Sequence, residues 1–138
     1  MRGSSVVVML CGVLVSGTSV SADETPPPVM IKNMKDIDAA TVDLAANLEN
    51  KDFAAVAKNA AALQKLFAGT LHFWQERMFE DAVTQAQLAA KTAGEIATAA
   101  KGKNENGVLA ARKALIGACT ACHNAHRVKK PDGKYEIK

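Results

Sequence analysis

Apolar residues recur at spacings of three and four through most of the chain, which is the repeat of one face of an α-helix. Four such segments follow one another, at residues 30–48, 52–68, 71–100 and about 104–128. The sequence shows neither an internal repeat nor the alternating apolar and polar pattern that marks a strand. It therefore predicts an all-α fold. The most regular apolar face is the first, formed by Met30, Met34, Ile37, Thr41, Leu44 and Leu48.

Short breaks separate these four segments. Residues 50–52 interrupt the chain after the first segment, and residues 101–103 end the third. Between the second and third, Gly69 suits a C-terminal cap position and Thr70 an N-cap. Because short connections make successive helices antiparallel, the predicted architecture is an antiparallel up-down-up-down four-helix bundle.

The first 22 residues have the composition of a secretory signal peptide. Arg2 precedes an apolar run at residues 6–15, and small residues lead to a cleavage position after Ala22. The run is shorter than the roughly 20 residues that a membrane-spanning helix needs, so we expect no stable membrane insertion. Cleavage would remove Cys11 and leave the mature chain in the periplasm. The expected divisions are a signal peptide at 1–22, a proline-rich linker at 23–28, a helical domain at 29–130 and a flexible tail at 131–138.

Composition and charge exclude several classes of function. The chain has 17 basic and 14 acidic residues, a formal net charge of +3, which does not indicate a nucleic-acid partner. The sequence contains no Ser/His/Asp set, carboxylate pair or phosphate-binding glycine loop that points to an enzyme. The charged side chains interpreted as solvated helix faces or ends are Glu76, Glu80, Asp81, Arg127, Lys129 and Lys130.

The chemically distinctive motif is Cys119-Thr120-Ala121-Cys122-His123, a C-x-x-C-H run on the last expected helix. On a helix the two thiols and the imidazole lie at i, i+3 and i+4, so they leave one face. This arrangement is typical of c-type haem attachment, in which both thiols bond the porphyrin and the histidine ligates iron. We therefore predict one covalently bound haem c, held by Cys119 and Cys122, with His123 as an axial ligand.

Other interpretations of the motif stay open. A zinc site would need two more ligands at suitable spacing, and a thioredoxin-like site would need a βαβ pattern. A disulfide between Cys119 and Cys122 is compatible with export. A haem-free dithiol or metal-binding bundle is therefore the third hypothesis for this chain.

With this motif near its C-terminus, the chain resembles the class II c-type cytochromes, which are the cytochrome c-prime group and its methionine-ligated low-spin relatives. The specific part of the resemblance is 117–123 followed by Arg127, and weaker likenesses lie at 33–36, 52–56 and 73–77. One departure is His126, which stands where the family usually has Tyr or Phe. The connection between the second and third helices is also shorter than the family's.

The resemblance implies where the second axial ligand of the iron would lie. It places Met34 at the ligand position of the low-spin relatives, and Met30, one turn earlier, is the fallback. Met78, expected to face inward on the third helix, is a weaker candidate, and His72 is expected to be exposed. His126 would share the proximal side with His123.

Two functions follow from whether the second axial position of the iron, its sixth coordination position, is occupied. With Met34 bound, the protein would be a periplasmic monohaem electron carrier that serves redox partner proteins, as a monomer or homodimer. Arg127 would then contact a haem propionate. With no ligand there, the alternative is a five-coordinate, cytochrome c-prime-like protein that binds small gases such as NO or CO.

Overall fold

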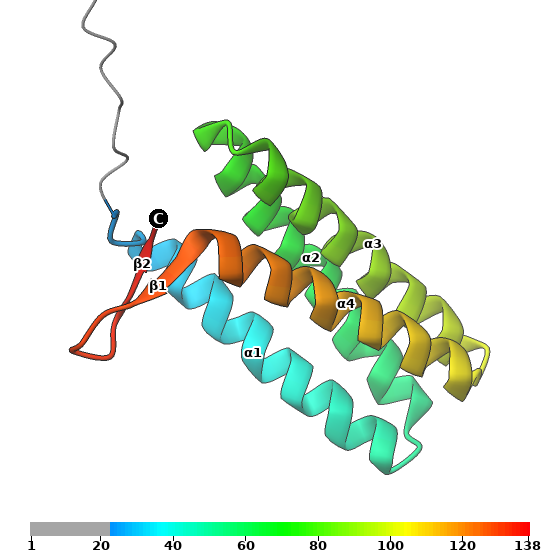
Figure 1. The fold of residues 1–138 in the computed structure, drawn as a ribbon. Coiled ribbons are helices and arrows are strands. Elements are labelled where there is room, and N and C mark those ends of the chain that lie inside the picture. The colour runs from blue at the N-terminus through cyan, green and yellow to red at the C-terminus, as the bar shows by residue number, and fades with distance from the viewer. Residues whose placement is uncertain (1–22) are drawn as a thin grey trace, which may run out of the picture.

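The computed structural model describes residues 23–138, so the expected signal peptide lies outside the described residues. These residues are mostly helical and contain four long helices, as the sequence predicts (Figure 1). No helix in this part of the chain is long and apolar enough to cross a membrane. The elements are α1 (Pro28–Glu49), α2 (Phe53–Arg77), α3 (Glu80–Lys101), α4 (Glu105–His126), β1 (Arg127–Lys129) and β2 (Tyr135–Ile137).

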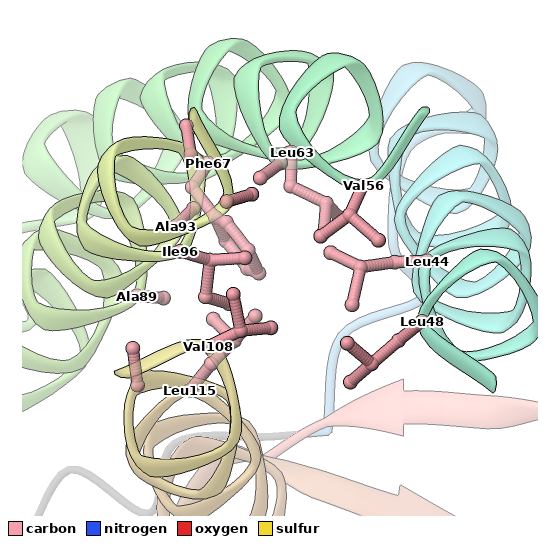
Figure 2. Close-up of a cluster of buried hydrophobic side chains, with 14 of the residues drawn as sticks. Leu44, Leu48, Val56, Leu63, Phe67, Ala89, Ala93, Ile96, Val108 and Leu115 are labelled. Atoms are coloured by element: carbon pink, nitrogen blue, oxygen red, sulfur yellow. The ribbon is translucent and has the colours of Figure 1, made fainter. Parts of the chain in front are cut away.

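One hydrophobic core runs through the bundle and receives side chains from all four helices (Figure 2). Each large apolar side chain that is fully buried there contributes roughly 1.5–3 kcal/mol to folding. The predicted apolar face of the first segment is confirmed, because Met30, Ile37, Leu44 and Leu48 are buried. The largest fully buried side chains are Leu44, Leu63, Ile96, Leu115, Val56 and Val108.

The four helices do not approach one another equally. The α1–α2, α2–α3 and α3–α4 pairs pack closely, whereas the backbones of α1 and α4 stay farther apart. The buried face of α3 consists largely of alanines, which lets α2 and α4 come close to it. Between α1 and α4 a groove of about 340 Å³ opens, lined by Thr41, Val42, Ala45, Ala46, Glu49 and Arg112.

The boundary that the sequence predicts between the second and third helices is wrong. Gly69 and Thr70 lie inside α2, which continues to Arg77. The amide of Asn33 on α1 donates to the Thr70 hydroxyl at 2.9 Å and to the Leu66 carbonyl at 3.1 Å. Because Thr70 is satisfied by these contacts within the bundle, it is not needed as a cap.

The turn between α2 and α3 lies instead at Met78 and Phe79. Met78 has a φ of 58°, in the left-handed region, and its backbone N–H bonds back to the carbonyls of Trp74 and Gln75. The next helix begins with Glu80 and Asp81, whose negative charges are favourable at a helix N-terminus. Those two acids are the local signal that the predicted boundary overlooked.

The end of the chain differs from the expected flexible tail. β1 and β2 form an antiparallel hairpin, and Glu24 pairs with Ile137 through two backbone hydrogen bonds of 2.8 Å. Ile137 is buried beside Met30 and Trp74, and this burial holds the hairpin on the bundle. Strands of three residues are too short to show an alternating pattern, so residue spacing does not predict them.

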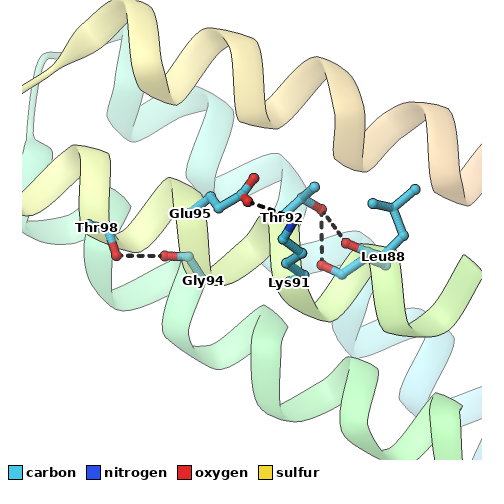
Figure 3. A network of polar contacts seen from close by, with 7 residues as sticks. Leu88, Lys91, Thr92, Gly94, Glu95 and Thr98 are labelled. Atoms are coloured by element: carbon cyan, nitrogen blue, oxygen red, sulfur yellow. Dashed lines mark hydrogen bonds and ion pairs between the residues drawn. The ribbon is translucent and has the colours of Figure 1, made fainter.

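Threonines within α3 bond to its own backbone rather than to other helices (Figure 3). The buried Thr92 hydroxyl donates to the Leu88 carbonyl at 2.8 Å, and the Thr98 hydroxyl donates to the Gly94 carbonyl at 3.0 Å. Such bonds satisfy a hydroxyl that would otherwise be costly to bury. Gly94 is the residue of this stretch with the lowest helix propensity.

We predict that Gly94→Ala stabilises the protein by up to about 1 kcal/mol, the difference in helix propensity between the two residues. A Cβ at position 94 would meet the Gln64 amide nitrogen at 2.8 Å, but that is the free end of an exposed, flexible side chain. Urea denaturation followed by circular dichroism measures the change.

Gly107→Ala is the matched control and should not stabilise. Its Cβ would lie 3.0 Å from Cγ of Asn104, whose side chain caps α4, and 3.1 Å from Cβ of Ala99. If Gly94→Ala destabilised the protein as much as Gly107→Ala, the space that we assign to position 94 would not exist.

Candidate functional site

The C-x-x-C-H residues lie on the last two turns of α4, as the motif requires. Cys119, Cys122 and His123 are all partly buried and leave the same side of the helix. Among the described residues both cysteines are free thiols. The structure thus presents two thiols and one imidazole together, at the edge of the core.

Two groups of buried side chains meet at this edge. Cys119 packs against the main core, whereas Cys122 packs against a second group that we call the end cluster. Met34 of α1 packs against both groups, so the predicted ligand borders the group that receives Cys119 and the group that receives Cys122. The end cluster consists of Met30, Phe73, Trp74, Ala82, Ala86 and Ile137.

Two of the weaker candidate ligands lie in solvent. Met78 is 85% exposed at the turn between α2 and α3. The prediction that it faces inward is wrong, because it depended on the misplaced helix boundary. His72 is exposed, as expected, and its Nε2 lies 3.3 Å from the Glu76 carboxylate one turn further along α2.

His126 is buried and belongs to an aromatic group. Its ring centroid lies 5.1 Å from that of Trp74 and 5.4 Å from that of Phe79. Its Nε2 lies 2.7 Å from Oδ2 of Asp81, and because an ionised carboxylate can only accept, Nε2 is the donor. Asp81 is therefore more than part of a solvated helix face, and His126 fills a space suited to an aromatic ring.

The environment of the motif favours the neutral form of each of its side chains. Burial, followed by the neighbouring Cys119 and Asp81 charges, raises the pKa of Cys122 to about 11. Burial also raises the pKa of Cys119, and burial together with the positive charge of Arg127 lowers the pKa of His123. A neutral imidazole is the form that ligates a metal. Raised thiol pKa values are the opposite of what dithiol redox sites use.

Arg127 lies next to the motif but is exposed. It is the first residue of β1, and its guanidinium carbon lies 4.3 Å from the ring centroid of Tyr135. Its charge reaches the motif, because it opposes the rise in the pKa of Cys122 and adds to the lowering of the pKa of His123. The side chain is thus available to an anionic group that is held at this turn.

The donor set fits the group that the motif implies. Two protonated thiols one helical turn apart and an adjacent neutral imidazole are the side chains that covalent attachment and axial ligation of haem need. Within residues 23–138 no group of three or more His, Cys, Asp and Glu side chains is placed to hold a metal ion by itself.

Comparisons of the chain with protein-family models, with curated proteins and with solved structures find no match. The functional interpretation therefore depends on the motif residues and on where the fold places them. The His126–Asp81 contact was missed by the sequence analysis because it joins residues 45 positions apart. The sequence feature that pointed toward this contact is His126, which stands where the resembled family has Tyr or Phe.

We predict that the thiols of the haem-free chain react slowly with iodoacetamide at neutral pH. A thiol with a pKa of about 11 carries about 100-fold less thiolate at pH 7 than one at the ordinary 9. Cys119→Ala, which leaves Cys122 as the reporter, should show a rate that keeps rising above pH 9. The urea-unfolded variant is the control, and an equal rate before and after unfolding would show that burial does not protect this thiol.

We also predict a pH-dependent loss of stability for Asp81→Asn. The hydrogen bond from His126 holds the pKa of Asp81 below its ordinary 3.8. This contact therefore contributes stability above about pH 3.8, which is lost as the pH falls through the folded-state value. The difference in unfolding free energy between wild type and variant should be full at pH 5 and above and shrink below pH 3.8. Glu80→Gln, in the same helical turn, is the control for loss of a negative charge at the helix N-terminus. If it gave the same pH profile as Asp81→Asn, the stabilisation would not come from the hydrogen bond with His126.

Proposed function

We propose that this chain is an exported monohaem c-type cytochrome of the class II kind that acts as an electron carrier. Cys119 and Cys122 would hold haem c through thioether bonds, and His123 and Met34 would be the axial ligands. The observation that carries the proposal is that Met34 packs against both buried groups, one of which receives Cys119 and the other Cys122.

The arrangement of the helices supports this assignment. Met34 is on α1 and the motif is on α4, the two neighbouring helices whose backbones stay farthest apart. A flat group ligated from both sides needs such a separation, whereas α2 and α3 pack too closely to admit one. Met30 is buried in the end cluster one turn before Met34, so it is the natural alternative ligand.

When bound, haem supplies a one-electron couple at its iron. The residues of the chain determine the conditions around it. His123 is kept neutral by burial and by the charge of Arg127, and the Met34 thioether favours ferrous iron over ferric. The two buried groups would exclude water from the ligated side, and Arg127 would offer a positive charge to a propionate.

Transfer to and from redox partner proteins would be outer-sphere, without a substrate at the metal. Periplasmic location would follow from the signal peptide expected at residues 1–22. A homodimer remains compatible with the chain and is not needed for the role proposed here.

We predict that the exported protein carries one haem by mass and shows a low-spin spectrum. Met34→Ala should convert the spectrum to a high-spin form that binds carbon monoxide rapidly, because the sixth position opens. Optical titration of both proteins measures this change, and Met30→Ala is the matched control because it lies one turn away on the same helix face.

The outcomes separate the two haem functions. If only Met30→Ala converted the spectrum to the high-spin form, Met30 would be the distal ligand in place of Met34. A wild-type protein that is already high-spin, binds carbon monoxide and is unchanged by Met34→Ala would be a gas-binding protein instead. A mass equal to that of the bare polypeptide would exclude both.

A further inference from the structure

The segment that forms the β1–β2 hairpin carries the net charge of the chain. Residues 127–138 contain five basic and two acidic side chains, and the rest of the sequence contains twelve of each sign. The excess of three positive charges in this short segment therefore equals the formal net charge of the whole chain. Charge that is concentrated in this way produces a positive potential over one part of the surface.

Ion pairs neutralise only part of this charge. The Lys130 ammonium lies 2.9 Å from the Glu136 carboxylate and 3.9 Å from that of Asp23, and the Lys134 ammonium lies 3.5 Å from the Asp132 carboxylate. The other basic side chains of the hairpin make no ion pair within the part of the chain that the structure describes. These side chains, all exposed, are Arg127, Lys129 and Lys138.

An exposed aromatic ring lies against two of these cations. Tyr135 is 42% exposed, and its ring centroid lies 4.3 Å from the guanidinium carbon of Arg127 and 6.0 Å from Nζ of Lys129. The ladder between β1 and β2 pairs Lys129 with Tyr135, and the burial of Ile137 holds the hairpin on the bundle. We call Arg127, Lys129 and Tyr135 the hairpin cluster. Tyrosine and arginine are enriched where proteins bind proteins.

The hairpin cluster lies beside the C-x-x-C-H turn. Arg127 directly follows α4, and its charge contributes to the lowered pKa of His123. The backbone N–H of Lys138 donates to the carbonyl of His126 at 3.2 Å, so this lysine also lies at the end of α4. A molecule that docks on the cluster is therefore close to whatever group the motif holds.

We infer that the hairpin cluster is a docking surface for an acidic face of a partner protein. Resting on the proposed function, this partner is the electron donor or acceptor, and its carboxylates would meet the cluster beside the haem. An Arg127 side chain engaged by a propionate would leave Lys129 and Tyr135 to receive the partner, with Lys138 at the end of α4.

The make-up of the surface favours a protein over a membrane. Sites for anionic lipids are typically clusters of about four to eight basic residues. The hairpin instead offers three unpaired cations and an exposed tyrosine. Opposite charges on two proteins mainly accelerate their encounter, and electron-transfer complexes are among the weak ones with small interfaces. A small cationic patch with one aromatic ring suits such a complex.

The first experiment titrates the ¹⁵N-labelled protein with a hexaglutamate peptide, which stands in for the acidic face, and with hexalysine as the control of opposite charge. Backbone amide signals of residues 127–129 and 135–138 should shift with hexaglutamate but not with hexalysine. The shifts should fade as sodium chloride is raised, because salt at 0.1 M screens exposed charges beyond about 10 Å.

Two variants remove the same charge from opposite ends of α4. Lys129→Gln, just after the helix, should weaken hexaglutamate binding by up to about fivefold, the upper range for one exposed ion pair. Lys101→Gln, at the end of α3, should leave it unchanged. Tyr135→Phe keeps the ring and should bind as wild type does, whereas Tyr135→Ser should bind more weakly. The amide signal of Ile137, which pairs with Glu24, shows that the hairpin is still formed in each variant.

Electron transfer gives a second measurement. Hexacyanoferrate(III), an anion, takes one electron from the ferrous protein and becomes hexacyanoferrate(II). This reaction should slow as salt is raised and in Lys129→Gln, whereas Lys101→Gln should react at the wild-type rate. The reduction potential of each variant is measured as well, so that a change in driving force is not mistaken for a change in encounter.

The docking surface and the proposed function fail separately. Hairpin signals that respond to hexaglutamate in a chain without haem would support the docking surface and refute the cytochrome. A haem-bound protein whose hairpin does not respond would overturn the docking surface alone. It is also overturned if these signals shift with protein concentration alone, which would identify a second copy, or with phosphatidylglycerol vesicles but not hexaglutamate, which would identify a membrane. Equal weakening by Lys129→Gln and Lys101→Gln would show that net charge, not the cluster, attracts the peptide.

Discussion

The burial of His126 against Trp74 and Phe79, with its Nε2 bonded to Asp81, determines where the last turn of α4 lies. This contact joins the end of α4 to the turn between α2 and α3. Cys122 and His123 lie on the same turn of α4, so this contact also holds them in place. A phenyl ring in place of His126 would fill the space, but it would not bond the start of α3.

Burial alone accounts for most of the site's electrostatic character. It disfavours whichever form of a group is charged, so it raises the pKa of both thiols and lowers that of His123. The same physical cause therefore makes the cysteines poor thiolate nucleophiles and the histidine a good neutral ligand. The site needs no special acid or base to reach this state, only a place at the edge of a core.

The sequence predicted what depends on local periodicity and missed what depends on distant contacts. The α1 face from Met30 to Leu48 and the helical C-x-x-C-H turn could be read directly, because each follows from residue spacing. The α2–α3 boundary could not, because Thr70 is satisfied by Asn33 of another helix. The C-terminal hairpin could not either, because it is held by Glu24 and by the burial of Ile137.

The unequal packing of the helices explains how a small bundle can be stable although one pair of neighbouring helices is loosely packed. α2 and α3 form the close pair, with alanines between them, and α1 is fixed to α2 by the bonds of Asn33 and by the 3.0 Å contact between Asn47 and Asn59. These contacts position α1 without requiring it to meet α4 closely. The α1–α4 side is thus the one that the fold depends on least, and Met34 and the motif both lie there. Met34 and Cys119 nevertheless pack against the main core, so the candidate site and the core share side-chain contacts.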